Sequence, residues 1–257
     1  LYYPIEKAMA KLSDAIININ SEDYEITKNK LKPKKCYFIN GVGIDLKKYK
    51  KLSEDKISTI KESLGLKAND FVVLMIAELN KNKNHMQVIN AMEYLKDRYP
   101  NIKLLCAGGG NYITYLSEQI ISKDLQNNIF MLGYRQDVNN LINISDIGIL
   151  MSYREGLPRN LMEFMACGRK VIVTNIRGCR DIVCNYSVGT LVNVGDAEAT
   201  AHAIEDYYVA SDRRFIVSDE INKYDIRNVN NELLKVYEDI ELEINGEKGL
   251  ASYATNR

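Results

Sequence analysis

Two carboxylates and one lysine are the residues of this 257-residue chain best suited to chemistry on a polar ligand. Seven residues separate Glu155, in a turn after an apolar run, from Glu163, inside an expected helix. Lys83 lies in an Asn/Lys-rich turn just before another expected helix. Carboxylates accept hydrogen bonds from sugar hydroxyls, and a lysine at a helix N-terminus is a natural phosphate ligand. A solvated lysine is the alternative reading that composition alone favours.

The helix that contains Glu163 is expected to begin at Pro158 and to end at Gly168. Proline is favoured at the first helical position, and glycine tolerates the left-handed conformation that closes a helix. The first backbone N–H groups of a helix are free and lie at the positive end of its dipole, where phosphate binds. The predicted anion cradle consists of Gly156, Leu157, Pro158, Arg159, Asn160 and Leu161.

Glu163 has apolar neighbours on both sides, at Met162 and Phe164. A helix that apolar is buried over most of its surface, so a carboxylate within it needs a polar partner. A ribose diol is such a partner, and an exposed helix glutamate is the alternative.

The regular part of the chain alternates apolar runs with helical segments, which predicts an α/β fold with a parallel, doubly wound sheet. In such sheets, ligands bind beyond the carboxyl ends of the strands. Glu155, Lys83 and the loop Gly133-Tyr134-Arg135 all follow such runs. Arg135 suits a nucleotide base, or is simply solvated. The expected strands are 71–77, 102–107, 129–132, 147–151 and 170–174, and the expected helices are 85–99, 112–123, 138–144, 158–167, 197–209 and 225–240.

The N-terminal stretch predicts a separate β-α-β unit. A helix is expected over residues 5–14, strands over 15–19 and 35–39, and a helix capped by Ser21 between the strands. At the other end, residues 241–257 are polar and without periodicity, which predicts a loose tail.

Composition indicates a globular protein with 46% hydrophobic and 26% charged residues and zero net charge, so nothing favours a nucleic-acid partner. There is no apolar run long enough for a transmembrane helix and no signal-peptide pattern. An odd count of five cysteines without a paired framework suits a reducing compartment, and we expect a cytoplasmic protein without a metal site. Residues 28–61 carry eleven lysines and three acidic residues. This run indicates a solvated linker or, less favoured, contact with the anionic inner face of a membrane.

The central stretch resembles a known family. The run Glu155-Gly156-Leu157-Pro158, Glu163 and Ala166-Cys167-Gly168, between two apolar strands, is similar to the Glu-x7-Glu motif of retaining glycosyltransferases of family 4, which have the GT-B fold. Residues 77–85 resemble the first phosphate loop of that family, and residues 39–45 resemble its interdomain hinge. The likeness spans roughly residues 1–240.

The resemblance implies a role for each motif residue. Glu155 would lie at the transferred sugar, Glu163 would bind the ribose, and Lys83 would bind the diphosphate without a divalent ion or other cofactor. The loop Gly133-Tyr134-Arg135 would lie near the base. The family often has an arginine five residues before the lysine, where this chain has Glu78. Lys83 then acts with the helix at Pro158 alone, or with Arg154, or Glu78 holds Lys83 as an ion pair.

The resemblance also implies an activity, the transfer of a sugar from a nucleotide-diphospho-sugar to a glycan, often lipid-linked, in bacterial capsule, exopolysaccharide or O-antigen synthesis. A nucleotide-sugar 2-epimerase and a non-catalytic donor-binding subunit are the alternatives. We expect an N-terminally truncated chain that is weakly active or inactive alone. The expected parts are 1–45 from an acceptor-side domain, a lysine-rich linker at 46–69, a donor-binding domain at 70–224, a crossover helix at 225–240 and a tail at 241–257.

Overall fold

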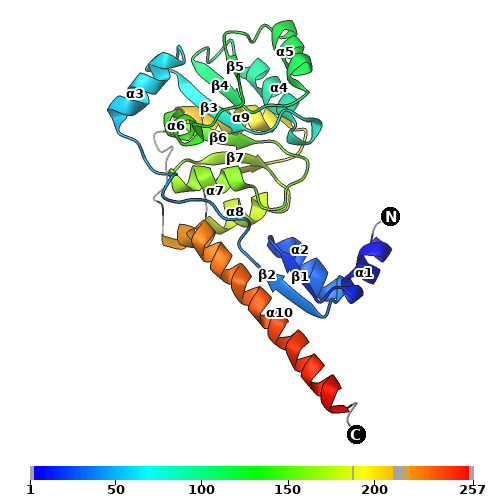
Figure 1. Ribbon diagram of the computed structural model, residues 1–257. Helices are drawn as coiled ribbons and strands as arrows, with labels where there is room; N and C mark the ends of the chain where they lie inside the picture. The colour runs from blue at the N-terminus through cyan, green and yellow to red at the C-terminus, as the bar shows by residue number, and fades with distance from the viewer. Residues whose placement is uncertain (1–2, 187, 211–216, 218, 255–257) are drawn as a thin grey trace. The chain divides into compact units, whose positions relative to one another are not determined.

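The computed structural model describes residues 3–186, 188–210, 217 and 219–254. The chain forms two compact units (Figure 1). The larger unit takes residues 46–221, and the smaller unit joins residues 1–45 to residues 222–257. Every residue with predicted site chemistry belongs to the larger unit.

A parallel six-stranded sheet forms the centre of the larger unit, in the order β5-β4-β3-β6-β7-β8. Strands of a parallel sheet are covered on both faces, and this explains why apolar runs predicted five of them to within one residue at either end. The sixth strand, β8, was not predicted. The strands are β3 Phe71–Ile76, β4 Ile102–Ala107, β5 Ile129–Gly133, β6 Ile147–Leu150, β7 Val171–Thr174 and β8 Gly189–Val192.

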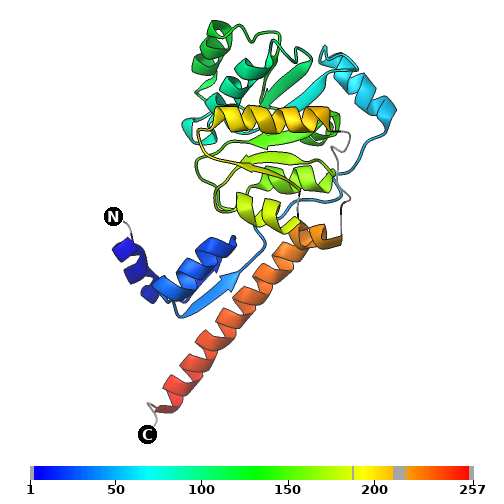
Figure 2. The same cartoon turned by 180° about the vertical axis from the view of Figure 1, so that it is seen from behind.

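Helices pack in two groups around this sheet. In one group α6 contacts α3 and α7, and α7 contacts α8; in the other, α4 contacts α5 and α9. Figure 2 shows α9 lying across one face of the sheet. The helices are α3 Glu54–Ser63, α4 His85–Leu95, α5 Ile113–Ser122, α6 Val138–Ile144, α7 Arg159–Ala166, α8 Cys179–Tyr186 and α9 Ala197–Val209, with short 3-10 helices η2 Lys81–Lys83 and η3 Asp219–Tyr224.

The stretch 46–69 is more than the linker that its lysines predicted. It lies within the larger unit and contains helix α3. Ser53 precedes this helix, and Glu54 and Asp55 occupy its first turn, where the helix dipole favours acidic residues. The buried side chain of Ile57 anchors one side of the helix.

The strand order reverses at β3. The chain crosses from β3 to β4 and β5 on one side, and β6 then pairs with β3 on the other side. At such a switch point the loops that follow adjacent strands turn in opposite directions, and this opens a crevice at the carboxyl ends. The loops after β3, β4 and β6 therefore frame the place where a ligand is expected.

The smaller unit contains the β-α-β arrangement that the sequence predicted. Strands β1 and β2 are parallel, and the helical segments α2 and η1 connect them. The predicted cap was wrong by one residue, because the Asn20 side chain, rather than Ser21, accepts the N–H of Asp23, at 2.8 Å. The elements are α1 Tyr3–Leu12, β1 Ala15–Asn18, α2 Ser21–Ile26, the π-helix η1 Thr27–Leu31 and β2 Lys35–Phe38.

The last helix, α10 Ile226–Ala254, is longer than predicted. The tail expected from Glu241 is helical as far as Ala254, because no proline interrupts the stretch and many of its residues favour helix. Within the unit, Val229 and Val236 pack with Ile39 of the segment after β2 in a buried apolar cluster. Among the described helices, none is both long and apolar enough to cross a bilayer.

Candidate functional site

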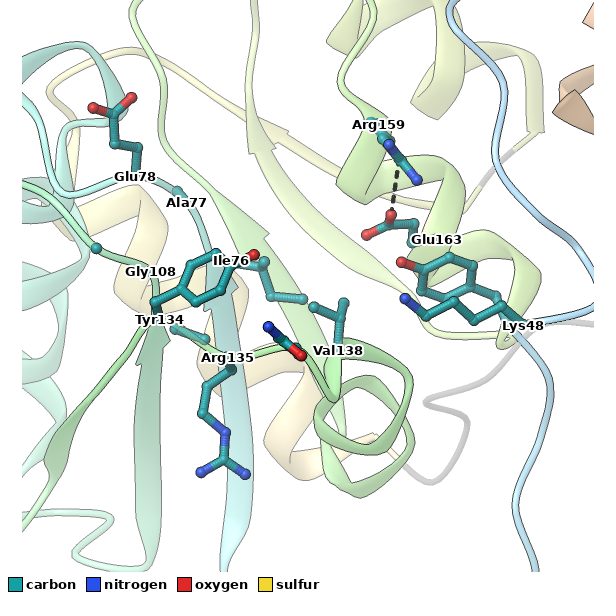
Figure 3. A pocket seen from close by; sticks show the side chains of 14 residues that line it. Lys48, Ile76, Ala77, Glu78, Gly108, Tyr134, Arg135, Val138, Arg159 and Glu163 are labelled. Atoms are coloured by element: carbon teal, nitrogen blue, oxygen red, sulfur yellow. Dashed lines mark hydrogen bonds and ion pairs between the residues drawn. The ribbon is translucent and has the colours of Figure 1, made fainter.

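A pocket of about 730 Å³ opens where the strand order reverses (Figure 3). Its wall combines the ends of β3 and β4, the loop after β5, helix α7 and a short segment before α3. The sequence predicts a ligand at the carboxyl ends of the strands, and the pocket lies at that end of the sheet. The lining residues are Lys48, Tyr49, Ile76, Ala77, Glu78, Ala107, Gly108, Gly109, Tyr134, Arg135, Gln136, Val138, Arg159 and Glu163.

Glycine is required where the loops after β3 and β4 meet. A Cβ atom on Gly108 would lie 1.9 Å from the carbonyl oxygen of Ala77, a distance at which one backbone must move. Gly108 therefore lies directly against Ala77 of the loop after β3, and both residues line the pocket.

Glu163 lies in the pocket wall and is almost completely buried, with 6% of its surface exposed. Its Oε1 accepts a hydrogen bond from Nε of Arg159, one turn earlier, at 3.2 Å (Figure 3). Burial raises the pKa of Glu163, and the hydroxyl of Tyr49 and the guanidinium of Arg159 counteract part of that rise by interacting with the carboxylate. The structure therefore excludes the exposed-glutamate reading and leaves a desolvated acceptor facing the pocket.

The raised pKa of Glu163 predicts a cost to stability near neutral pH. A carboxyl with a higher pKa in the folded state binds its proton more tightly there, so the folded state loses relative stability as pH rises through that pKa. We expect Glu163→Gln to raise the melting temperature at about pH 7 by a few degrees, since about 1 kcal/mol corresponds to roughly 2–4 °C in a domain this size. The gain should vanish near pH 3, more than one unit below the ordinary glutamate pKa of about 4.3, because the carboxyl is then protonated in both states.

Thermal unfolding of the 257-residue chain at both pH values measures this effect. Glu118→Gln, at an exposed position of α5, is the matched control and should change neither melting temperature. An equal gain from Glu163→Gln at both pH values would contradict the ionisation argument.

Lys83 and Glu155 are not among the residues that line this pocket, but they form an ion pair with each other, with Nζ and Oε1 2.6 Å apart. Their side chains are 24% and 13% exposed, so the pair is largely shielded from water. Two hydrogen bonds join the loops that carry them, from Asn82 Nδ2 to the Arg154 oxygen and from the Tyr153 N–H to the Asn82 oxygen. These loops follow β3 and β6, which are neighbours in the sheet. The fold thus brings together two residues that lie 72 positions apart.

The ion pair decides between the arrangements that the sequence left open for Lys83. In the described chain its carboxylate partner is Glu155, so the reading in which Glu78 holds Lys83 is wrong. Figure 3 shows Glu78 at the edge of the pocket with its carboxylate directed away from Glu163. Arg154 is exposed, and its backbone oxygen helps to join the two loops.

Helix α7 begins one residue later than predicted, at Arg159, with Pro158 as the residue before it. The Leu161 N–H donates to the Pro158 oxygen at 3.2 Å, so the prediction of a free N–H is wrong at Leu161. Asn160 donates from its side chain to the Ile76 oxygen at 2.9 Å, which ties the start of α7 to the end of β3. Of the predicted cradle only Arg159 lines the pocket; Gly156, Leu157, Pro158, Asn160 and Leu161 do not.

The loop after β5 places Tyr134 and Arg135, but not Gly133, in the pocket wall. Tyr134 is 76% exposed, so its ring is available for contact with a ligand. Arg135 instead makes two 2.8 Å hydrogen bonds to Asp137, which lower the pKa of that carboxyl, and its guanidinium points away from Glu163 (Figure 3).

The sequence reading missed Lys48 and Tyr49, which the structure adds to the pocket. Asn143 of α6 fixes this segment by accepting the Leu52 N–H at 2.9 Å and donating to the Lys50 oxygen at 3.0 Å. The only signal was a single aromatic residue within a run of lysines.

No group of three or more His, Cys, Asp or Glu side chains placed to bind a metal occurs among the described residues.

This chain is similar to known glycosyltransferases. The model of the family "Glycosyl transferases group 1" matches residues 56–217. EpsD of Bacillus subtilis is 34% identical over 213 residues, which are 81% of this chain and 55% of EpsD. The UDP-Gal:alpha-D-GlcNAc-diphosphoundecaprenol alpha-1,3-galactosyltransferase of Escherichia coli is 29% identical over 79% of this chain and 54% of its own length. The chain thus spans about half the length of these relatives.

Solved structures identify the fold. The crystal structure of Anabaena HepE in complex with UDP-glucose matches 92% of this chain and 67% of its own, with a TM-score of 0.79 at 21% sequence identity. The fold is the α/β GT-B fold of glycosyltransferases. Since the family model covers most of the chain, including the Lys83–Glu155 pair and Glu163, this chain belongs to the group 1 glycosyltransferases.

Proposed function

We propose that this chain carries the donor-binding part of a retaining glycosyltransferase of family 4. The enzyme would move a sugar from a nucleotide-diphospho-sugar to a lipid-linked glycan in bacterial surface polysaccharide synthesis. The observation that carries the proposal is that Lys83 and Glu155 form an ion pair between the loops after the neighbouring strands β3 and β6, while Glu163 lines a 730 Å³ pocket at the same end of the sheet. A cation for phosphate and two acceptors for hydroxyls are the groups that a nucleotide sugar requires.

Different residues of the site would bind different parts of the donor. Glu163, buried in the pocket wall, would accept hydrogen bonds from the ribose hydroxyls, and the exposed ring of Tyr134 would contact the base. Lys83 would bind the diphosphate. Glu155, 2.6 Å from Lys83, would then lie where the diphosphate joins the sugar, close to the anomeric carbon.

Transfer breaks the bond between the anomeric carbon and the diphosphate oxygen and forms a bond from that carbon to an acceptor hydroxyl oxygen, whose proton passes to the leaving diphosphate. Negative charge grows on the leaving nucleoside diphosphate, where Lys83 and the first N–H groups of α7 would stabilise it. Positive charge grows at the anomeric carbon, where the Glu155 carboxylate would stabilise it. Under this proposal the chain's own groups take the place of a divalent ion.

The acceptor and the cellular site are proposed from the relatives. The E. coli relative is named for an undecaprenol-linked acceptor, so a lipid-linked sugar is the acceptor proposed here. The larger unit would be the donor-binding domain, and the smaller unit would belong to an acceptor-side domain. The lysine-rich run 28–61 would favour an anionic membrane at its cytoplasmic face.

Transfer by the full-length protein tests the proposal. UDP- and GDP-sugars are supplied with an undecaprenyl-diphosphate-linked sugar in EDTA, and NMR determines the anomeric configuration of the product. We expect transfer with the donor's configuration retained, and roughly a thousandfold loss in Glu155→Gln, the scale of losing one group that stabilises transition-state charge. An inverted product, an epimerised sugar without transfer, or a requirement for Mg²⁺ or Mn²⁺ would each contradict it.

A further inference from the structure

A completely buried serine lies behind Glu155. Ser152 stands two residues after β6 in the same loop, and its hydroxyl donates to Oε1 of Glu155 at 2.6 Å. Neither Ser152 nor Thr174 at the end of β7 has exposed surface. The Thr174 hydroxyl donates to the Ser152 backbone oxygen at 2.7 Å. A chain of two hydrogen bonds therefore runs from β7 to the carboxylate of Glu155.

Two donors of different character share the same oxygen of Glu155. Lys83 Nζ lies 2.6 Å from Oε1, at the end of a long side chain with several rotatable bonds. The Ser152 hydroxyl lies 2.6 Å from Oε1, on a short side chain within packed structure. The lysine can turn to another anion, whereas the short serine side chain is completely buried and has little room to turn away.

We propose that Ser152 is a positioning residue that keeps Glu155 in place when Lys83 turns to the diphosphate of the donor, with Thr174 fixing Ser152 from β7. The inference rests on the proposed function, in which Lys83 binds phosphate and Glu155 faces the sugar. A lone Lys83–Glu155 pair would release the carboxylate at the moment when its position matters. The buried hydroxyl supplies a second attachment that the donor does not compete for.

The geometry suits this role. Ser152 and Lys83 both take Oε1, so the two donors together occupy only one of the two carboxylate oxygens. A buried hydroxyl requires a hydrogen-bond partner, and Glu155 is the partner that the structure gives Ser152. Ser152 follows the central strand β6 and is hydrogen-bonded to Thr174 of β7. Through Ser152, the sheet fixes the position of Glu155, which then does not depend on the flexible lysine side chain.

The test separates positioning from stability. In the full-length protein, Ser152→Ala should lower kcat for transfer roughly tenfold, in the range expected when a catalytic group is displaced by less than 1 Å. The affinity of the 257-residue chain for UDP should stay within twofold of the parent. Ser145→Ala is the matched control, because Ser145 is equally buried and its hydroxyl donates to the Ile142 oxygen at 2.8 Å, away from the site. It should leave kcat unchanged.

A double-mutant cycle shows whether Ser152 acts through Glu155. In a Glu155→Gln background, which has lost the carboxylate, Ser152→Ala should have little further effect, whereas two independent residues would give additive losses. Thr174→Val, which retains the serine hydroxyl, should give a smaller loss than Ser152→Ala and covers the case in which Ser152→Ala does not fold.

The outcomes distinguish failure of the Ser152 positioning role from failure of the proposed function. If Glu155→Gln lowers kcat and both Ser152→Ala and Thr174→Val turn over like the parent, the positioning role is overturned while the proposed function stands. Additive losses in the cycle also overturn it. If Glu155→Gln itself turns over like the parent, the proposed role of Glu155 fails, and the inference fails with it.

Discussion

Lys83→Ala is expected to lower the affinity of the 257-residue chain for UDP by roughly 10- to 100-fold. Hydrogen bonds to charged groups contribute about 1.5–3 kcal/mol, and each 1.4 kcal/mol is tenfold in affinity. The substitution removes the cation and also leaves Glu155 without its ion-pair partner, so an uncompensated carboxylate would face the diphosphate. Calorimetric titration in EDTA, which excludes a metal bridge, measures the effect.

Two comparisons show whether the loss concerns phosphate. Affinity for uridine, which carries no phosphate, should be the same in Lys83→Ala and the parent. Lys81→Ala is the matched control, because Lys81 begins the same 3-10 helix η2 and is exposed. It should change UDP affinity less than twofold. Equal UDP affinity in Lys83→Ala and the parent would remove the phosphate role from Lys83.

The strands of the sheet could be predicted because each leaves a pattern within its own short stretch of sequence. Each central strand is buried on both faces, so each appears as a short continuous run of apolar residues, and β4 Ile102–Ala107 was predicted to the residue. The edge at which a ligand binds then follows from the alternation of strands and helices alone. Strand β8 Gly189–Val192 was not predicted because it is short, begins with glycine and is only partly buried.

The contacts within the site could not be predicted, because they depend on strand order. Lys83 meets Glu155 only because β6 pairs with β3, and the sequence does not specify which strand lies beside β3. Once the lysine had been assigned to phosphate, nothing in the pattern indicated that it pairs with a carboxylate 72 residues away. The place of Tyr49 in the pocket could not be predicted for a similar reason, since it depends on Asn143, which is distant in sequence and holds the neighbouring backbone.

Errors at helix ends have local causes. Asn20 and Ser21 are both good caps, and the choice between them depends on which side chain reaches the Asp23 N–H. At the C-terminus, the absence of an apolar stripe after residue 240 was read as loss of helix. Helix α10 continues to Ala254, because a helix needs no apolar stripe where its residues favour helix and no proline interrupts it.

Glu163→Ala is expected to weaken UDP binding to the 257-residue chain by roughly 10- to 100-fold, because a charged hydrogen bond to a ligand contributes about 1.5–3 kcal/mol. The structure adds a reason for a large effect. Glu163 is buried, which raises its pKa, so its carboxylate has lost most of its hydration before the nucleotide arrives and a ribose hydroxyl need not displace a full hydration shell. The same burial makes Glu163 a cost to stability, a common trade-off between stability and activity.

Comparison of UDP with 2′-deoxy-UDP by calorimetry at about pH 7 assigns this loss to the ribose. The parent should prefer UDP by about tenfold, the scale of one hydrogen bond to a charged group, and Glu163→Ala should bind both nucleotides equally. Glu118→Ala, at an exposed position of α5, should keep the preference of the parent. If Glu163→Ala weakened both nucleotides by the same factor, the carboxylate would act by shaping the pocket around Arg159 and Tyr49 instead. Because Lys83→Ala should leave the ribose preference intact, the two substitutions together test whether phosphate and ribose are bound by separate residues.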